Sequence, residues 1–164
     1  MDADVIMCRS AVSLAAAYHV SRLMYEPHIY NELCDEYKDL FEAHRMLVEI
    51  EEGIRAVILV REKNVVVGCI HGTFEGDGDF VCHIMFKRNV NSLKGCLLCE
   101  KAMKEYCLEH QITFKRVVGY ICMNNRAVIR LGKKYGAIDH GISNVSIWKD
   151  GYLLPCRKLI KEIF

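Results

Sequence analysis

The sequence has no apolar run as long as a membrane span, no large net charge and no repeated or low-complexity segment. A bilayer-spanning helix needs about 20 consecutive apolar residues, so we do not expect a membrane protein built from helices. The formal net charge is only +1 over 164 residues. Binding to nucleic acid or to a membrane surface that is driven mainly by charge is therefore not expected either.

The first residues, MDADVIM, also lack the basic segment and the apolar core of a signal peptide. We therefore expect the protein in a reducing cytoplasm, where disulfides are rare. The nine cysteines are mostly flanked by apolar residues, and we interpret them as small buried side chains. Cys96 and Cys99 have the spacing of a metal-ligand pair, but no second pair or suitably spaced His completes a zinc set, so no metal is expected.

No linker divides the chain, and its length is enough for one domain with its own core. A short strand is expected at 4–8, and two helices are expected within 10–25 and 31–51. From residue 54 the apolar residues alternate as they do in strands, with short turns between the segments. The expected elements there are strands at 54–61, 64–74, 79–87 and 117–122, and a helix at 93–110.

The end of the chain is expected to be a hairpin. Asp150-Gly151 is a strong two-residue turn signal, and it follows a candidate strand at 142–148. A short helix from Arg157 is the alternative. Pro155 would confine the returning strand to an edge or to a bulge. We expect Trp148 to pack on the core.

The segment from Asn125 to Gly136 has the signals of a helix that follows a buried strand. An Asn side chain can cap the first turn by accepting from a backbone amide. Gly136 stands where a helix ends in a left-handed residue. Apolar residues recur between them at helical spacing, at Ala127, Val128, Leu131 and Tyr135.

This segment resembles the second conserved segment of the GNAT acyl-CoA N-acetyltransferases, in which a strand is followed by an Asn, an Ala-Ile-containing helix and a closing Gly. Counted from Asn125, the matching positions hold Ala127, Ile129, Arg130, Leu131 and Gly136-Ala137. The resemblance covers roughly residues 54–160. It implies an α/β (α+β) GNAT-like fold, with a mixed, mostly antiparallel central sheet and helices on both faces. One domain would span 1–164, with an N-terminal strand and helices in 1–53 and the core sheet, the cofactor-loop helix and the closing hairpin in 54–164.

The resemblance also implies transfer of an acetyl group from acetyl-CoA to an amine on a small molecule or a protein. In the family, free amides at a helix N-terminus cradle the CoA pyrophosphate, within a loop of the pattern R/Q-x-x-G-x-G/A. The three defining positions are Asn89, Ser92 and Lys94 in this chain, and none matches the pattern. Either Asn91 or Ser92 could cap the helix that follows. The cofactor-binding residues implied are Ile84, Met85, Phe86, Asn91, Ser92, Lys94, Gly95 and Asn125.

Attack by an amine on a thioester needs a base that takes the amine proton. His83 and His71 are the best-placed candidates, and the alternative is that each is a core histidine with its polar atoms satisfied. The family commonly has its general acid, a Tyr, seven residues after the Asn, where this chain has Gly132. Tyr135 lies one helical turn later and is the candidate acid, with a place in the core as the alternative.

Two functions from different classes remain open. The first is an N-acyltransferase that works by direct transfer between two bound substrates. The second is a non-catalytic protein of the same fold that binds or assembles with other proteins, as a homodimer or with another partner. The Gly-Ala ending of the helix is similar to that of bacteriophage-encoded GNAT-like proteins, which would place the protein in a host cytoplasm or in a virion.

Overall fold

The computed structural model describes residues 1–6, 13–33, 35, 45, 48–50 and 52–163. Its strands are β1 (Asp2–Ile6), β2 (Arg55–Glu62), β3 (Val65–Glu75), β4 (Asp79–Phe86), β5 (Arg116–Cys122), β6 (Ile138–Lys149) and β7 (Tyr152–Glu162). Its helices are α1 (Ser13–Met24), α2 (Pro27–Tyr30), α4 (Ser92–Glu109) and α5 (Arg126–Tyr135). Most of the helix predicted within 31–51 lies outside the described residues.

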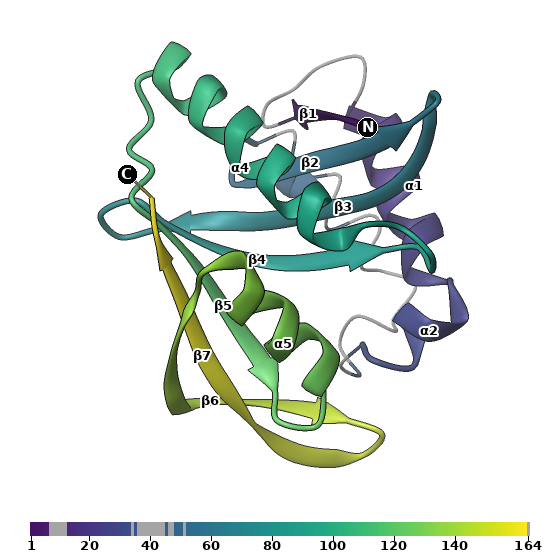
Figure 1. The fold of residues 1–164 in the computed structure, drawn as a ribbon, viewed down its shortest axis with the longest axis vertical. Helices are drawn as coiled ribbons and strands as arrows, with labels where there is room; N and C mark the ends of the chain where they lie inside the picture. The colour runs from purple at the N-terminus through teal and green to yellow at the C-terminus, as the bar shows by residue number, and fades with distance from the viewer. Residues whose placement is uncertain (7–12, 34, 36–44, 46–47, 51, 164) are drawn as a thin grey trace.

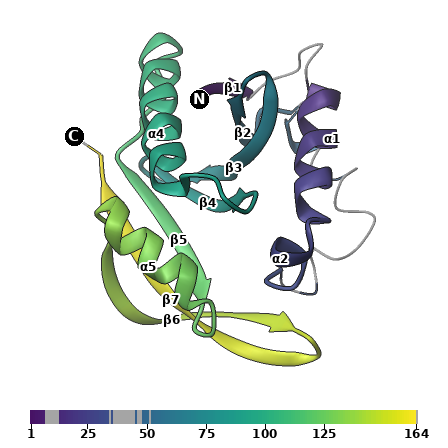
Figure 2. The ribbon, with the colours of Figure 1, turned by 45° about the vertical axis from the view of Figure 1, so that its right-hand side comes forward.

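Within the described ranges the strands form one seven-stranded sheet in the order β1-β2-β3-β4-β5-β7-β6. Neighbouring strands are antiparallel, except that β4 and β5 are parallel. Helices α4 and α5 lie on one face of this sheet, and α1 and α2 lie on the other (Figure 1 and Figure 2). The predicted mixed, mostly antiparallel sheet with helices on both faces is confirmed. No described helix is long and apolar enough to cross a membrane.

Each face of the sheet has its own apolar core, because successive side chains of a strand point to opposite faces. The core on the α1 side includes Val20, Leu23, Val57, Leu59, Cys69 and Met85. The core on the α4 side includes Ile58, Ile70, Phe80, Phe86, Cys96, Cys99 and Met103. Even-numbered residues of β4 therefore face α4 and α5, and odd-numbered residues face α1 and α2.

The described cysteines are small buried side chains, as predicted. Six of them are buried and Cys82 is half-buried; the buried ones are Cys69, Cys96, Cys99, Cys107, Cys122 and Cys156. Burial raises the pKa of the Cys96 thiol to about 12, although the nearby positive charge of Lys161 acts to lower it. Thiols with such a pKa are poor nucleophiles at neutral pH.

The closing hairpin is confirmed, and the alternative helix from Arg157 is wrong, because β7 runs on to Glu162. Strand β7 lies between β5 and β6 and is not the edge strand of the sheet. Its pairing with β5 nevertheless ends at Cys156 opposite Cys122, so Pro155 lies just beyond that ladder. An irregularity is present on the β6 side as well. The register of β6 against β7 shifts between Ile142 and Ser146, and Ser146 is opposite Pro155. An irregular ladder tolerates a residue that has no amide to donate.

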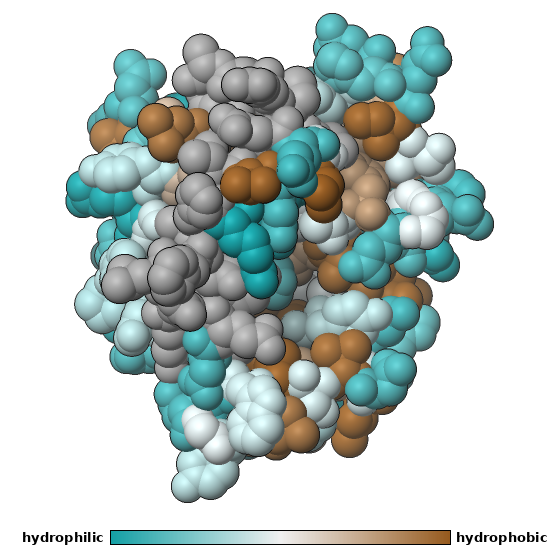
Figure 3. Space-filling view, turned by 180° about the vertical axis from the view of Figure 1, so that it is seen from behind, coloured by the Kyte–Doolittle hydropathy of each residue, from teal (hydrophilic) through white to brown (hydrophobic). Residues whose placement is uncertain are grey.

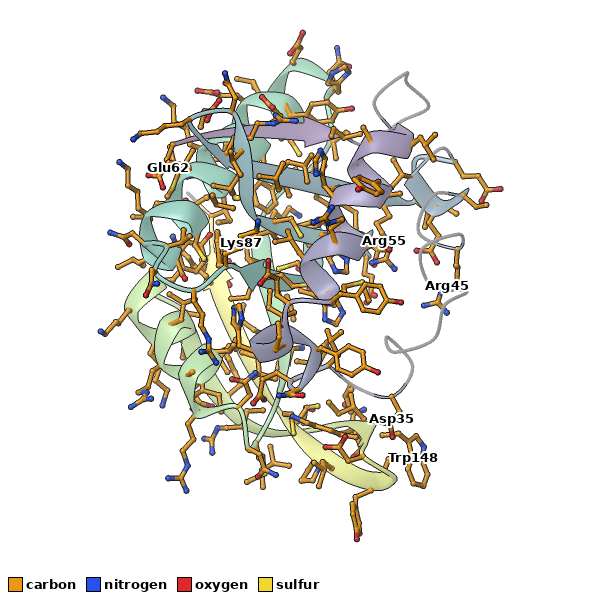
Figure 4. The ribbon with its side chains drawn as sticks, turned by 90° about the vertical axis from the view of Figure 1, so that its right-hand side faces the viewer. Asp35, Arg45, Arg55, Glu62, Lys87 and Trp148 are labelled. Atoms are coloured by element: carbon orange, nitrogen blue, oxygen red, sulfur yellow. The ribbon has the colours of Figure 1, made fainter. Side chains whose placement is uncertain are left out.

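Trp148 does not pack on the core, contrary to the prediction. It is 51% exposed and lies opposite Leu153, which is exposed as well. Figure 4 shows Trp148 at the tip of the hairpin, beside Asp35. The Asp35 carboxylate accepts hydrogen bonds from the amides of Asp150 and Gly151, which fixes the turn and leaves the tryptophan outside. Figure 3 shows apolar side chains at the surface of this lower part of the molecule.

Candidate active site

Strands β4 and β5 separate after three residue pairs. Their pairing runs from Asp79 opposite Arg116 to Val81 opposite Val118, although β4 continues to Phe86. Figure 1 shows β5 turning away from β4 toward the lower part of the molecule. The separation opens a gap in the middle of the sheet. Beyond Val81, no described strand pairs with β4 on the side opposite β3.

The backbone of β4 alternates between β3 and this gap. The amide of Lys87 donates to the carbonyl oxygen of Val67 at 2.8 Å, so the polar groups of Lys87 and, two residues earlier, Met85 face β3. Those of Ile84 and Phe86 face the gap. Nε2 of His28 donates to the Phe86 carbonyl oxygen at 2.9 Å and so joins α2 to the end of β4.

A cavity of about 490 Å³ occupies the gap. Its wall on the α5 side includes Ser92, Cys96, Asn125, Val128, Leu131 and Tyr135. Its wall on the α2 side includes Met24, His28, Ile29, Glu32, Leu33, His83 and Met85. The cavity therefore connects the two faces of the sheet through the gap, and its volume is in the range of small-molecule sites. Among the described residues, no three His, Cys, Asp or Glu side chains gather as metal ligands would.

Helix α4 begins at the edge of this cavity. Asn91 is its N-cap, since its side-chain oxygen accepts from the Lys94 amide at 3.0 Å. Ser92 is the first helical residue and lines the cavity. Gly95 faces Phe86 instead, because a Cβ at Gly95 would lie 2.4 Å from the phenylalanine ring. The close packing of strand against helix thus requires Gly95, whatever binds at the cavity.

Helix α5 begins at the opposite side of the cavity. Asn125 is its N-cap, with its side-chain oxygen 3.1 Å from the Val128 amide that donates to it. At the other end, Gly136 has a φ of +97°, which is the left-handed conformation that the sequence predicts there. Because Asn125 also lines the cavity, one residue both starts the helix and borders the site.

Replacing Asn125 with Ala is expected to lower the free energy of unfolding by about 1 kcal/mol, because the Val128 amide loses its partner. Urea unfolding measures this loss. Asn124→Ala is the matched control, since Asn124 is exposed and is not the cap. Equal stability of the two variants would show that the cap does not contribute.

Tyr135 is held in a cluster of charges between α4, α5 and β7. Its hydroxyl donates to the Glu100 carboxylate, which also forms an ion pair with Lys161. Nζ of Lys161 lies 3.8 Å from the centroid of the Tyr135 ring. Burial, and then Glu100, raise the pKa of Tyr135 far above its usual value. Tyr135 is therefore a poor acid in this arrangement, and its side chain packs against the core on the α4 side.

Replacing Tyr135 with Phe is expected to cost about 1.5 kcal/mol of stability, because a hydrogen bond to a charged group is lost. In an assay of acetyl transfer, we expect kcat to change less than about threefold, since loss of a general acid would lower it about 100-fold or more. Tyr152→Phe, at an exposed position, is the control. A drop of 100-fold in kcat with unchanged stability would instead make Tyr135 the acid.

His83 lies on the opposite face of the sheet from Tyr135, and it is accessible from the cavity. The residue is exposed in the structure. Desolvation by the protein atoms around the ring, and then the positive charge of Arg55, lower the pKa of His83 to about 4. The ring is therefore neutral at neutral pH. His71 is 1% exposed and contributes to the lining of the same cavity, beside His83.

This sequence matches neither a protein-family model nor a curated protein. Solved structures match along nearly the whole chain. A GNAT-family acetyltransferase from Streptococcus pneumoniae has a TM-score of 0.68 at 18% identity, over 99% of this chain and 100% of its own. An acetyl transferase from Salmonella typhimurium has a TM-score of 0.74 at 8% identity, over 100% of this chain and 96% of its own. This chain has the GNAT fold.

A third match is the microcin C7 self-immunity acetyltransferase, solved with acetyl-CoA and AMP. Its TM-score is 0.68 at 11% identity, over 99% of this chain and 93% of that one. At such identities the matches establish the fold alone. The organisms named above are bacteria, and the resemblance to phage-encoded proteins gains no support from them.

Gly132 stands where the family commonly has its tyrosine, and close packing accounts for a small residue at this position. A Cβ at Gly132 would lie 2.5 Å from Cδ2 of Leu159, in β7. Helix α5 thus approaches the sheet so closely that a larger residue could not fit there without moving Leu159.

Four residues that shape this GNAT site were not singled out from the sequence: His28, Arg55, Glu100 and Lys161. Glu100 and Lys161 are 61 positions apart, so nothing local links them. Arg55 did carry a signal, since a charged residue at the start of an apolar strand needs a buried partner. His28 follows Pro27 in a four-residue helix, and no residue near it in the sequence indicates its hydrogen bond to β4.

Proposed function

We propose that the protein transfers an acetyl group from acetyl-CoA to an amine. The cavity that joins the two faces of the sheet is the observation that carries this proposal. A donor entering from the α5 side and an acceptor entering from the α2 side would meet at the gap between β4 and β5. Direct transfer between two bound substrates needs this meeting point.

The donor has chemically suitable groups on the α5 side. Backbone groups of Ile84 and Phe86 face the gap, and an edge of this kind can hydrogen-bond an extended amide chain such as pantetheine. The start of α4 offers amides and a positive dipole end to the pyrophosphate. The residues we assign to donor binding are Ile84, Met85, Phe86, Asn91, Ser92, Lys94, Gly95 and Asn125. Of these, Ile84, Phe86, Ser92 and Asn125 line the cavity, and Asn91, Lys94 and Gly95 belong to the start of α4 beside it. The side chain of Met85 lies on the α2 side, so its part in donor binding is the weakest of the set.

In the reaction, the amine nitrogen attacks the thioester carbonyl carbon, and the C–N bond forms as the C–S bond breaks. We assign the proton lost by the amine to a ring nitrogen of His83. The electron pair of the C–S bond leaves with sulfur as the CoA thiolate. A thiol pKa of about 8.5 makes that thiolate an acceptable leaving group, and water entering the cavity can protonate it. Tyr135, turned toward Glu100, is not needed for this step.

The acceptor class follows from the α2 side of the cavity. Its wall is mainly apolar there, and the carboxylate of Glu32 already pairs with Lys149 at 3.1 Å. We therefore infer an amine that arrives neutral and is carried on an apolar group, on either a small molecule or a protein. The Salmonella typhimurium protein modifies the N-terminal serine of a ribosomal protein, so peptide N-termini belong in the test set.

One observation favours the second function, a binding protein without catalysis. The Lys94 amide, at the helix start where pyrophosphate would bind, already donates a hydrogen bond to the Asn91 side-chain oxygen. A donor phosphate would have to displace that cap or use the neighbouring amides. In that case the protein would act through a homodimer or another assembly partner.

Mass spectrometry of acetylated products tests the proposal. The protein is incubated with acetyl-CoA and a panel of amines, which includes alkylamines, aromatic amines and short peptides with free N-termini. We expect product from at least one apolar amine, and none when His83 is replaced by Ala. Donor binding without product from any amine would favour the binding protein.

A further inference from the structure

A buried histidine of the cavity lining and a buried arginine behind it stand in line with His83. Arg55 is 7% exposed and His71 is 1% exposed. Nη1 of Arg55 donates to Nδ1 of His71 at 2.9 Å. The rings of His71 and His83 are stacked, with centroids 5.3 Å apart and 22° between their planes. Three neighbouring strands, β2, β3 and β4, thus carry one row of polar side chains that ends at the cavity.

The far end of this row is anchored. Oε2 of Glu49 accepts from Nε of Arg55 at 2.5 Å, and Arg45 lies 3.6 Å from the other Glu49 oxygen. Figure 4 shows Arg55 and Arg45 on the α1 side of the sheet. The guanidinium of Arg55 is therefore held from both sides, by a carboxylate and by an imidazole.

The hydrogen bond from Arg55 selects one form of His71. A guanidinium only donates, so Nδ1 of His71 must be the nitrogen without a proton. Neutral His71 then carries its proton on Nε2, and a second proton would have to displace the guanidinium. Burial, together with His83 and Arg55, accordingly lowers the pKa of His71 well below its usual value.

We propose that Arg55 and His71 are positioning residues for His83, which hold its ring in one orientation and in its neutral form on the cavity wall. The inference rests on the proposed acetyl transfer with His83 as base. Stacking on a fixed His71 restricts the rotation of the His83 ring. The charge of Arg55 opposes a second positive charge on either imidazole.

This arrangement also decides where the proton goes. A guanidinium is always protonated in proteins and cannot accept a further proton. The row is thus closed at Arg55 and cannot conduct a proton into the interior. The proton that His83 takes from the amine must leave through the cavity, in which His28, Glu32, Tyr120 and His71 are the other titratable side chains on that face.

Two substitutions of His71 separate the two contacts. His71→Gln keeps an acceptor for Arg55 but removes the stacked ring, whereas His71→Phe keeps a ring and removes the acceptor. We expect His71→Gln to lower kcat up to about 100-fold, because a poorly oriented group loses most of its effect, with the KM for acetyl-CoA unchanged. His71→Phe should retain more activity and shift the titration of His83.

A third variant tests the effect of the Arg55 charge on the pKa of His83. Titration of the His83 ring by NMR needs no substrate, and Arg55→Gln is expected to raise its midpoint by about one pH unit. Arg61→Gln, on the same strand but paired with Asp4, should leave that midpoint unchanged. Since Arg55→Gln leaves Glu49 without its partner, the double variant Glu49→Gln/Arg55→Gln is the version to use if the single one unfolds.

These measurements distinguish failure of the positioning role from failure of the proposed acetyl transfer. An unchanged His83 midpoint in folded Arg55 variants, or full kcat in His71→Gln, would overturn the positioning role. The expected shifts in a protein that acetylates no amine would overturn the proposed function and leave the control of His83 by Arg55 in place. Shifted titration together with reduced kcat is the result we predict.

Discussion

Replacing His83 with Ala is expected to lower kcat/KM for acetyl transfer by about 10²–10⁴-fold, the usual contribution of a general base. His83 lies on the wall of the cavity, so its loss removes the proton acceptor without removing a core side chain. His140→Ala is the matched control, since His140 is exposed on β6, outside the cavity wall. Steady-state kinetics and an unfolding curve for each variant complete the comparison. Retained turnover in folded His83→Ala would exclude His83 as the base.

The pH dependence of acetyl transfer by the wild-type protein gives an independent check on the same residue. In the proposed mechanism the neutral ring is the active form, and its pKa is about 4. The activity that depends on His83 should therefore be lost as the pH falls through about 4, and should not change with the protonation of this ring from about pH 5 upward. An ordinary histidine would begin to lose activity near pH 6.5. An acid limb at that higher pH that disappears in His83→Gln would contradict the lowered pKa.

Filling the gap at Gly119 is expected to abolish donor binding. Gly119 lines the cavity and pairs with Leu159, whose side chain meets Gly132 of α5. A side chain at Gly119 would thus leave the sheet on the donor side. There is room for its first atom, because a Cβ would be 3.7 Å from the nearest side-chain atoms, those of Ile121. A phenylalanine continues from there into the space that pantetheine would need.

Gly119→Phe is therefore predicted to lose all stabilisation by acetyl-CoA and all transfer, and to remain folded, since strands accept aromatic residues well. Gly119→Ala is the control, and it should keep most of the donor affinity. Isothermal titration with acetyl-CoA measures both variants. Equal affinity of Gly119→Phe and the wild type would show that the donor does not use this cavity.

The order of the elements could be predicted because each signal is local. Apolar alternation marked the strands, and Asn125 and Gly136 marked the two ends of α5. The turn at Asp150-Gly151 placed the closing hairpin. In each case the residues that decide the structure are within a few positions of one another, so a single sequence contains the information.

The errors concern contacts between distant segments. Pro155 suggested an edge strand, but the sheet places β6 outside β7, and the proline lies beyond the end of the β5 ladder and beside a shift in the β6 register. Trp148 is exposed at the tip of a hairpin whose turn is held by Asp35, from another part of the chain. The pairing of Arg55 with His71 likewise depends on the register between β2 and β3, which no local pattern gives. The site is assembled from such contacts, and this is why its residues were harder to predict than its fold.

Thermal unfolding with and without millimolar acetyl-CoA tests the central claim most directly. A ligand that binds only the folded protein, at about 100 times its dissociation constant, adds about 2.7 kcal/mol of stability. We predict a dose-dependent rise in the unfolding midpoint for the wild type and no rise for Gly119→Phe. An unchanged midpoint for the wild type at saturating acetyl-CoA would contradict the account, and would show that the capped start of α4 no longer accepts the donor.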